Sequence, residues 1–293
     1  MNRAGDDQVS VQEQQMHHYN GRRSMKVAFQ GERGAYSEEA IISHWADVAE
    51  PIPCPHLHDV FDVVEGGLVD MGLIAVENTI EGTVARSLDL LYERPLKVLD
   101  ETVLRVRHCL ISNPGVKMLD IKRVYSHPQA LGQSQAYLYS RGYEPVGVYD
   151  TAGSVSLVKK QYMLDAAAVA SRRAAEVYGM EILAEGIETN IENYTRFLAV
   201  GEGDTGPTGR DKTSLAFTLE RSETLIEALH SISIGDATLL RIDSRPLLGE
   251  PWKYVYFIDI EGHIAEPAVR NAVEKLGEKA THIKHLGSYP RAG

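Results

Sequence analysis

Cysteine is scarce in this sequence, and basic residues are scarce relative to acidic ones. The chain has 293 residues and only two cysteines, Cys54 and Cys109, which lie far apart. Such a pair gives neither a disulfide framework nor the thiol spacing of a zinc site, and it favours a reducing compartment. Lysine and arginine total 30 against 41 acidic residues, a net charge of -11. This excess argues against nucleic acid or an anionic membrane as the main partner.

Long apolar runs are also missing. No stretch approaches the roughly 20 apolar residues needed to span a bilayer. The first 24 residues are polar, lack the apolar core of a signal peptide and are predicted to be disordered, and Met25 offers an alternative start. We therefore expect a cytoplasmic protein of about two domains, at roughly 150 residues for each domain.

From Lys26 onward, a strand, a polar stretch and a helix follow one another four times. Strands are predicted over 27–29, 71–76, 121–125 and 146–149. The first strand is followed by a helix over 38–45, the second by a helix that ends at Tyr92, the third by a helix that ends at about Tyr139, and the fourth by a helix around Val158. The polar stretches between them are 31–37, 77–84, 126–131 and 150–154. Alternating strands and helices form parallel sheets, which bind ligands beyond the carboxyl ends of their strands. The four polar stretches therefore predict a binding cleft.

The first of these stretches has its own local signals. Gly31 and Gly34 allow a ligand to approach the backbone closely, and Ser37 is placed to cap the following helix. The spacing of these glycines differs from the dinucleotide-binding pattern. Such a helix start would favour anions, but an ordinary tight turn is the preferred interpretation of these two glycines.

A fifth polar stretch, 193–197, leads directly into an apolar strand. Its sequence is Asn-Tyr-Thr-Arg-Phe. Strand alternation places Asn193, Thr195 and Phe197 on one face and turns Arg196 to the other. One face of the strand therefore offers an amide, a hydroxyl and an aromatic ring.

The remaining pattern predicts how the chain is divided. Extended segments between 97 and 110 and around 182–200 carry the chain between two lobes, and a later βαββαβ order is typical of the ferredoxin-like split unit. The predicted divisions are a tail (1–24), a two-lobed region (25–200, with lobes of approximately 25–103 plus 190–200, and 104–189), a glycine-rich linker (201–211) and a C-terminal unit (212–293).

Five motifs together resemble the signature set of prephenate dehydratases. They are Gly-x-x-Gly-Ala-Tyr-Ser (31–37), Val-Glu-Asn-Thr-Ile-Glu-Gly-Thr-Val (76–84), Ser-His-Pro-Gln-Ala-Leu (126–131), Asp-Thr-Ala-Gly-Ser (150–154) and Asn-Tyr-Thr-Arg-Phe (193–197). The C-terminal unit resembles the ACT regulatory domain of that family. The resemblance covers about 26–286, and it implies an α/β catalytic domain like the type II periplasmic-binding proteins, followed by a ferredoxin-like ACT domain.

What the resemblance implies is decarboxylative dehydration of prephenate to phenylpyruvate in L-phenylalanine biosynthesis, by a lyase that needs no cofactor. Thr195 maps to the family's catalytic donor to the departing C4 hydroxyl. The residues implied to bind substrate are Ser37, Asn78, Thr79, Ser126, Gln129, Thr151, Ala152, Asn193, Arg196 and Phe197. Two alternatives stay open: an arogenate dehydratase with the same chemistry, and a cytoplasmic sensor of aromatic amino acids that has lost catalysis.

The resemblance also implies regulation by L-phenylalanine and assembly into a homodimer or homotetramer. The family's Glu-Ser-Arg-Pro motif corresponds to Asp243-Ser244-Arg245-Pro246 here. Counting back without a gap, the Gly-Ala-Leu motif, which helps to bind the inhibitor, falls on Glu223-Thr224-Leu225. A glutamate thus replaces the glycine, which predicts weaker inhibition because its carboxylate would repel that of phenylalanine.

The histidines do not predict a metal site. His56 and His58 form one pair and His282 and His285 another, but neither pair has a third ligand at a usual spacing. Histidine is a common acid–base catalyst, yet for His127 a structural role at its strand end is the preferred interpretation.

Overall fold

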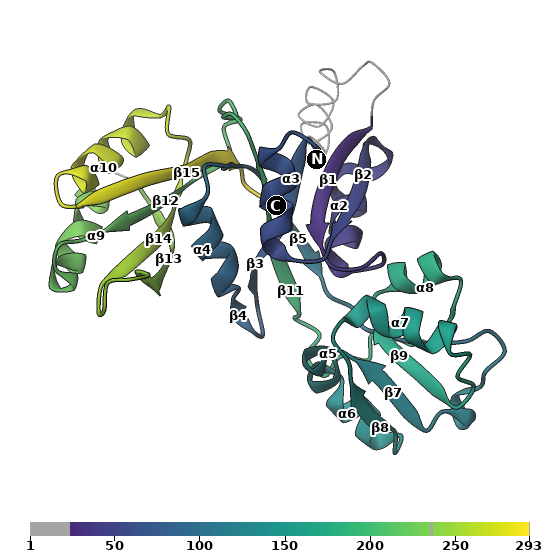
Figure 1. The fold of residues 1–293 in the computed structure, drawn as a ribbon. Coiled ribbons are helices and arrows are strands. Elements are labelled where there is room, and N and C mark those ends of the chain that lie inside the picture. Colours follow the sequence, from purple (N-terminus) through teal and green to yellow (C-terminus); the bar gives the residue numbers. More distant parts are fainter. Residues whose placement is uncertain (1–23, 235–236, 293) are drawn as a thin grey trace, which may run out of the picture.

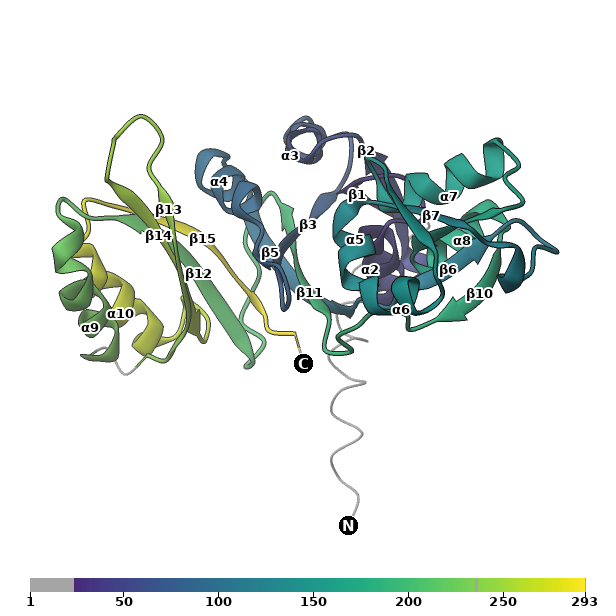
Figure 2. The same ribbon diagram turned by 90° about the horizontal axis from the view of Figure 1, so that it is seen from below.

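The computed structural model describes residues 24–234 and 237–292, and three sheets organise them. The predicted disordered tail, 1–24, lies outside this part except for Ser24. Figure 1 shows three units, with the first sheet in the middle and the C-terminal unit (α9, α10 and β12–β15) on the opposite side of it from the second sheet. Figure 2, seen from below, shows the same order.

The first sheet combines parallel and antiparallel strands. Its strands are β1 (Met25–Gln30), β2 (Ala49–Cys54), β3 (Met71–Asn78), β4 (Gly82–Thr83), β5 (Lys97–Arg105) and β11 (Tyr194–Gly201), in the order β2-β1-β3-β11-β5 with β4 on β3. Strands β1, β2 and β3 are parallel, whereas β11 runs antiparallel to both of its neighbours. The helices of this part are α2 (Tyr36–Trp45), α3 (Leu57–Glu65) and α4 (Ala85–Glu93), with a 3-10 turn at Ala46–Val48.

The second sheet is formed by the chain between β5 and β11. Its strands are β6 (Cys109–Ser112), β7 (Arg123–Ser126), β8 (Glu144–Gly147), β9 (Ala166–Ala170) and β10 (Glu181–Glu185), in the order β10-β6-β9-β7-β8. Its helices are α5 (Pro128–Gln133), α6 (Gln135–Ser140), α7 (Thr151–Lys160) and α8 (Arg172–Tyr178), with a 3-10 turn at Met118–Asp120. Strands β7 and β8 are parallel, as the sequence predicts, and β9, which was not predicted, is parallel to β7. Strand β6 is antiparallel to β9 and β10.

The C-terminal sheet has the predicted βαββαβ order. Its elements are β12 (Asp211–Thr218), a 3-10 turn (Ser222–Thr224), α9 (Leu225–Ile234), β13 (Leu239–Pro246), β14 (Tyr254–Glu261), α10 (Pro267–Gly277) and β15 (His282–Pro290). The strand order is β13-β14-β12-β15, with every neighbouring pair antiparallel.

Several local predictions need correction. The predicted helix running to Tyr139 is interrupted at Ser134, where α5 ends and α6 begins, and the strand predicted over 146–149 is observed at 144–147. Ser37 does not cap α2, since the residue before the helix is Ala35 and Ser37 lies in the first turn. The backbone N–H of Gly34 is bound instead by the carboxylate of Glu38, at 2.6 Å.

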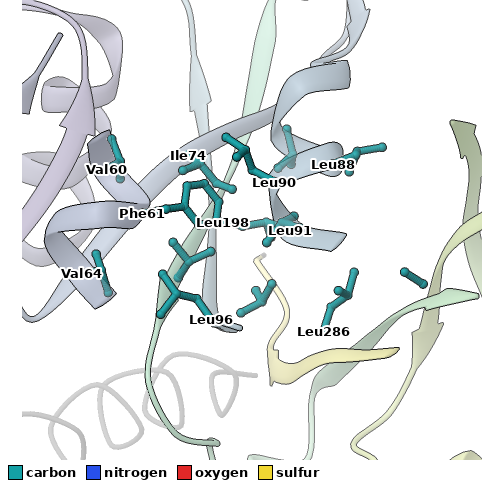
Figure 3. Packing of buried hydrophobic residues seen from close by; sticks show 14 of the residues in the cluster. Val60, Phe61, Val64, Ile74, Leu88, Leu90, Leu91, Leu96, Leu198 and Leu286 are labelled. Carbon is teal, nitrogen blue, oxygen red and sulfur yellow. The ribbon is translucent and has the colours of Figure 1, made fainter. Parts of the chain in front are cut away.

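A single apolar core joins the first sheet to the C-terminal unit. Leu88 and Leu91 of α4 and Leu198 of β11 pack in one cluster with Phe257 and Leu286 of the C-terminal sheet. Figure 3 shows Leu286 lying close to Leu91 and Leu96 in this core. At the edge of this core, the ammonium of Lys284 donates to the backbone oxygens of Leu91, Tyr92 and Arg94 at the end of α4. Within the part of the chain that the structure describes, no helix is long and apolar enough to cross a membrane.

Candidate active site

The carboxyl end of β3 brings Asn78 beside Thr195 on β11. The amide nitrogen Nδ2 of Asn78 lies 2.9 Å from Thr195 Oγ1 and 2.9 Å from Asn193 Oδ1. The other end of this amide is fixed, because Asn78 Oδ1 accepts from the backbone N–H groups of Ile80 (2.9 Å) and Glu81 (3.0 Å). A backbone N–H can only donate, so the Asn78 NH2 group must face Thr195. Thr195 therefore accepts from Asn78.

A second amide carries this network to the other lobe. Asn193 is fully buried, and its Nδ2 donates to Gln133 Oε1 of α5 at 2.9 Å. Gln133 Nε2 in turn donates to the Glu81 carboxylate at 3.1 Å. Since a carboxylate only accepts, it fixes the orientation of the Gln133 amide, as the backbone fixes Asn78. The two lobes are thus joined at this point by a chain of amides in one consistent direction.

Gln133 also contacts a buried histidine. His108 Nε2 lies 2.8 Å from Gln133 Oε1, and His108 Nδ1 lies 2.6 Å from the hydroxyl of Tyr36. Burial lowers the pKa of His108, although the hydrogen bond to Gln133 and the charge of Glu188 oppose this shift. Neutral His108 donates from Nε2 to Gln133 and accepts from Tyr36. The hydrogen bond from His108 thus helps to fix the position of the Gln133 amide.

A hollow of about 710 Å³ lies beside the network, on the side of α5 and α6. Its size is within the range of small-molecule sites. Thr195 is not among the residues that line it, but Glu81 and Gln133 belong to both the hollow and the network. The full lining is Ile80, Glu81, Gln129, Gly132, Gln133, Gln135, Ala136, Tyr139, Thr189 and Asn190.

The structure brings some of the predicted substrate residues together. Asn78, Asn193 and Thr195 form the network, and exposed Gln129 faces the hollow. Thr79 supports the network, since its hydroxyl donates to Glu192 O (2.7 Å) and accepts from Tyr194 N (2.9 Å). These residues come from three of the predicted polar stretches and both lobes.

Other predicted contacts lie elsewhere. Ser126 is fully buried and donates to Val169 O at 2.6 Å, and Ala152 and Phe197 are each 1% exposed in apolar cores. These three side chains are placed for packing, and their contact with a substrate stays a prediction. Arg196 faces away from Thr195, as alternation predicts, and binds acidic groups on the opposite side of the sheet. Its guanidinium is thus not available to a substrate beside Thr195.

The remaining polar stretches, 31–37 and 150–154, lie at the starts of α2 and α7. Gly34 approaches the backbone of α8 so closely that a Cβ at this position would lie 2.6 Å from Ala174 Cα. The close approach predicted for the glycines therefore serves contact between the lobes at Gly34. Asp150 caps α7 by accepting from Gly153 N (2.5 Å), which leaves Thr151 half-buried in the first turn. Ser37 lies in the first turn of α2.

Gln133, His108 and Glu81 were not predicted to belong to the site. For Gln133 a signal existed: it follows Gln129 by four residues in a helix, a spacing that places both on one face. The histidine at the strand end has the structural role that was preferred, since His127 Nδ1 accepts from Gln129 N at the start of α5. Within 24–234 and 237–292, no group of three or more His, Cys, Asp or Glu side chains is arranged to hold a metal ion.

The fold is α/β, and it holds the hydroxyl of Thr195 in a network of side-chain amides. The family model for prephenate dehydratase matches residues 27–205. An arogenate dehydratase/prephenate dehydratase of Arabidopsis thaliana is 39% identical over 283 residues, covering 92% of this chain and 74% of that protein. The chain therefore belongs to the prephenate dehydratase family, and it is a lyase of the hydro-lyase class.

Two solved structures share most of the fold. Prephenate dehydratase from Arthrobacter aurescens, in complex with L-Phe, is 29% identical with a TM-score of 0.83, covering 91% of this chain and 90% of that one. A protein described as a novel type of quorum-quenching acylase, GqqA, is 30% identical with a TM-score of 0.84, covering 90% of this chain and 97% of that one.

Proposed function

We propose that this protein converts prephenate to phenylpyruvate, carbon dioxide and water, with Thr195 assisting departure of the C4 hydroxyl. The bond between the ring and its carboxylate breaks, its electron pair enters the ring, and the C4–O bond breaks as the ring becomes aromatic. The departing hydroxide takes up one proton and leaves as water. Because aromatisation drives the reaction, the enzyme needs to orient the substrate and stabilise the leaving oxygen.

The direction of the Asn78 hydrogen bond is the observation that carries this proposal. A threonine hydroxyl has one hydrogen to donate. Since Thr195 Oγ1 accepts from Asn78, its own hydrogen is kept for another acceptor, which in the complex is the leaving oxygen. A neutral hydroxyl is a weak acid, so Thr195 acts as an oriented donor in a site from which water is excluded.

The same geometry argues against acyl transfer as the main activity. A hydroxyl nucleophile must lose its proton to a neighbouring base. The group that contacts Thr195 Oγ1 is the NH2 of Asn78, which donates and cannot accept a proton. Thr195 is therefore arranged to give a hydrogen bond, as dehydration requires.

An assay of phenylpyruvate formation tests the proposed function. Purified protein is expected to turn over prephenate, and parallel rates with arogenate separate the alternative substrate. We expect EDTA to leave the rate unchanged, because the site works through amides and a hydroxyl. Absence of turnover with either substrate would refute the function and favour a sensor. Loss of activity in EDTA that one divalent ion restores would refute the metal-independent chemistry.

The C-terminal unit is proposed to be an ACT regulatory domain that responds to L-phenylalanine. The register supports a common location for the two effector motifs: Thr218 pairs with Val255, and Pro246 pairs with Tyr254, so the 3-10 turn with Glu223 and the end of β13 lie at the same end of the sheet. Glu223 is largely exposed, with its carboxylate 3.8 Å from Arg221.

The side chains of the two proposed effector motifs, 223–225 and 243–246, point in different directions. Arg245 forms a bidentate pair with Asp89 of α4, and Asp243 accepts from Thr83, both in the first sheet's part of the chain. Ser244 and Pro246 are exposed on the opposite face of β13. Leu225 is partly buried against the core of the unit, and Thr224 donates to Arg221 O. Effector contacts by Asp243 and Arg245 therefore require these pairs to open.

The exposed charge of Glu223 should weaken L-phenylalanine binding. We expect Glu223→Gly to lower the Kd for L-phenylalanine about threefold, because it removes a carboxylate that repels the carboxylate of the ligand. Calorimetric titration of both proteins measures this, with Glu220→Gly as a control for general loss of charge. Tight binding by the wild type that Glu223→Gly weakens would contradict the expectation and indicate that Glu223 attracts the ammonium group.

We further propose a homodimer or homotetramer formed through the C-terminal unit. Strand β13 is an edge of its sheet in the described residues, and Ile226, Ile242, Leu248 and Trp252 are exposed around it. An unpaired edge with apolar neighbours is normally covered. Light scattering at working concentration should give at least twice the chain mass, and Trp252→Asp should lower it. A monomeric mass for the wild type would refute the assembly.

The predicted divisions fit the arrangement of the sheets. We propose a catalytic region of 25–200 with two lobes like those of type II periplasmic-binding proteins, a linker of 201–211 and an ACT domain from 212. The two extended connections between the lobes, β5 to β6 and β10 to β11, support this.

Both cysteines are free and buried, which supports a cytoplasmic location.

A further inference from the structure

Thr195 and Arg196 are adjacent on β11 but serve opposite faces of the first sheet. Thr195 contacts Asn78, whereas Arg196 extends toward the C-terminal unit. There its Nη1 lies 2.7 Å from Asp259 Oδ2 of β14, and its Nη2 lies 3.1 Å from the hydroxyl of Tyr289 of β15. The residue with the candidate catalytic hydroxyl is therefore followed directly in the chain by a residue that contacts the C-terminal sheet.

This contact is part of a larger network, which extends to Glu77 at 3.7 Å from Arg196 Nη1. Arg196 Nε lies 2.6 Å from Glu101 of β5, which is also bound by Lys212 of β12 at 2.8 Å. Ser214 Oγ lies 2.5 Å from Asp259 and 2.6 Å from the Tyr289 hydroxyl. The network thus pairs Arg196 and Lys212 with Glu101 and Asp259, and it contacts β12, β14 and β15 of the C-terminal unit.

The network is dry. The side chains of Arg196, Glu101 and Asp259 are 12%, 2% and 6% exposed. Burial alone would lower the pKa of the Arg196 guanidinium, but Tyr289, Asp259 and Glu101 outweigh it and raise the pKa above its ordinary value. Burial, followed by the charge of Asp259, raises the pKa of Tyr289. Charges in such surroundings are held at fixed positions, because an unpaired buried charge is costly.

Strand β11 has little freedom to absorb a displacement of Arg196. It lies between β3 and β5, and Phe197, the next residue, is buried. Next to Arg196 the pairing with β3 shifts register: Arg196 lies opposite Glu77 and Phe197 opposite Ala75, which leaves Val76 as an extra residue. A bulge of this kind fixes the direction of side chains. Movement of the Arg196 backbone is therefore passed to Thr195.

We propose that Arg196 is a positioning residue, through which Asp259 and Tyr289 of the C-terminal unit hold the Thr195 hydroxyl in its productive orientation. This inference rests on the proposed dehydratase function. It gives the C-terminal unit a constant role in catalysis that needs no effector. An error of about 1 Å in the position of a reacting group is enough to lower a rate about 100-fold.

Three variants on the C-terminal side and its interface test the proposal. Asp259→Asn removes the charge that holds Arg196 Nη1. Tyr289→Phe removes the hydroxyl that contacts Arg196 Nη2 and Ser214 Oγ, while it keeps the ring and every charge. Asp89→Asn is the matched control, because it weakens the ion pair with Arg245 in the same interface without touching β11. Circular dichroism and thermal unfolding establish that each variant is folded.

We expect kcat with prephenate to fall about 10- to 100-fold in Asp259→Asn and about threefold in Tyr289→Phe, with KM changed by less than about twofold. Asp89→Asn should keep the wild-type kcat. The sharpest measurement is a double-mutant cycle with Thr195→Ala. Once the hydroxyl is gone, Asp259→Asn or Tyr289→Phe should lower the residual rate by less than about twofold, since no donor is left to misplace.

Each result decides the proposal. Equal kcat values for Asp89→Asn and both network variants would overturn it, as would a change in KM alone or an additive cycle, which would indicate a general structural role. If Asp259→Asn does not fold, Tyr289→Phe and its cycle decide. A wild type without dehydratase activity refutes the proposed function, whereas an active wild type with an additive cycle refutes only the positioning role.

Discussion

Thr195→Ala is expected to lower kcat with prephenate by about 10²- to 10⁴-fold, the usual contribution of a positioned proton-transfer group. The substitution removes the one hydroxyl that Asn78 orients, at 2.9 Å, toward the substrate. The fold should persist, because Thr195 is only half-buried and its backbone pairs with Asn78 and Leu104 are kept. KM should change little, since a hydrogen bond to the leaving oxygen strengthens mainly in the transition state.

Steady-state kinetics of phenylpyruvate formation measure this effect, and Thr195→Ser is the matched control. Serine keeps the hydroxyl and loses only the methyl group, so it should retain most of the activity. A folded Thr195→Ala protein with near-wild-type turnover would remove Thr195 from the mechanism. Equal losses in the alanine and serine variants would indicate that packing of the methyl group matters more than the hydroxyl.

Gly287→Ala is expected to be the most destabilising of these single changes. In β15, Gly287 lies so close to β5 that an added Cβ would be 2.2 Å from Val98 O and 2.9 Å from Val98 N. Both atoms belong to the backbone of a paired strand, so they cannot move aside as a flexible side chain would. Overpacking typically costs about 1–3 kcal/mol, and we expect the upper end of this range because the clash is with backbone atoms. The substitution should therefore weaken the contact between β15 of the C-terminal unit and β5 of the first sheet.

Thermal unfolding followed by circular dichroism tests this expectation. A loss of about 3 kcal/mol corresponds to a decrease in Tm of about 6 to 12 °C for a cooperative unit of this size. Gly206→Ala is the control, since a Cβ at Gly206 meets no atom within 4 Å. It should leave Tm nearly unchanged. Equal Tm values for the two variants would show that β15 can move away from β5 at little cost.

The sequence predicts the elements whose patterns are strong and misses those whose composition is misleading. Strand β2 contains Pro51 and Pro53, which argue against an internal strand; it is in fact an edge strand, where proline is tolerated. Strand β9 is Ala166–Ala170, with four alanines and one valine, a composition with low β-propensity. It forms a strand because it is completely buried between β6 and β7.

The site was predictable to the extent that its residues lie in recognisable motifs. Asn78, Asn193 and Thr195 meet as expected, since strand ends bring them to one edge of a sheet. Motif membership does not reveal which side a residue faces, and the side chains of the predicted contacts Ser126 and Ala152 are buried. The participation of His108 could not be foreseen, because it depends on the distance between two lobes that only the folded chain defines.

The position of β11 has a consequence for the order in which the protein forms. This strand lies between β3 and β5, yet it is synthesised after the whole second sheet. The second sheet has its own apolar clusters and can collapse as soon as it leaves the ribosome. Until β11 is made, β3 lacks one neighbour and β5 has no strand partner in the sheet, and such unpaired edges invite association with other chains. Insertion of β11 therefore completes the sheet and places Thr195 beside Asn78 in the same step. Chains that end before β11 are expected to be inactive.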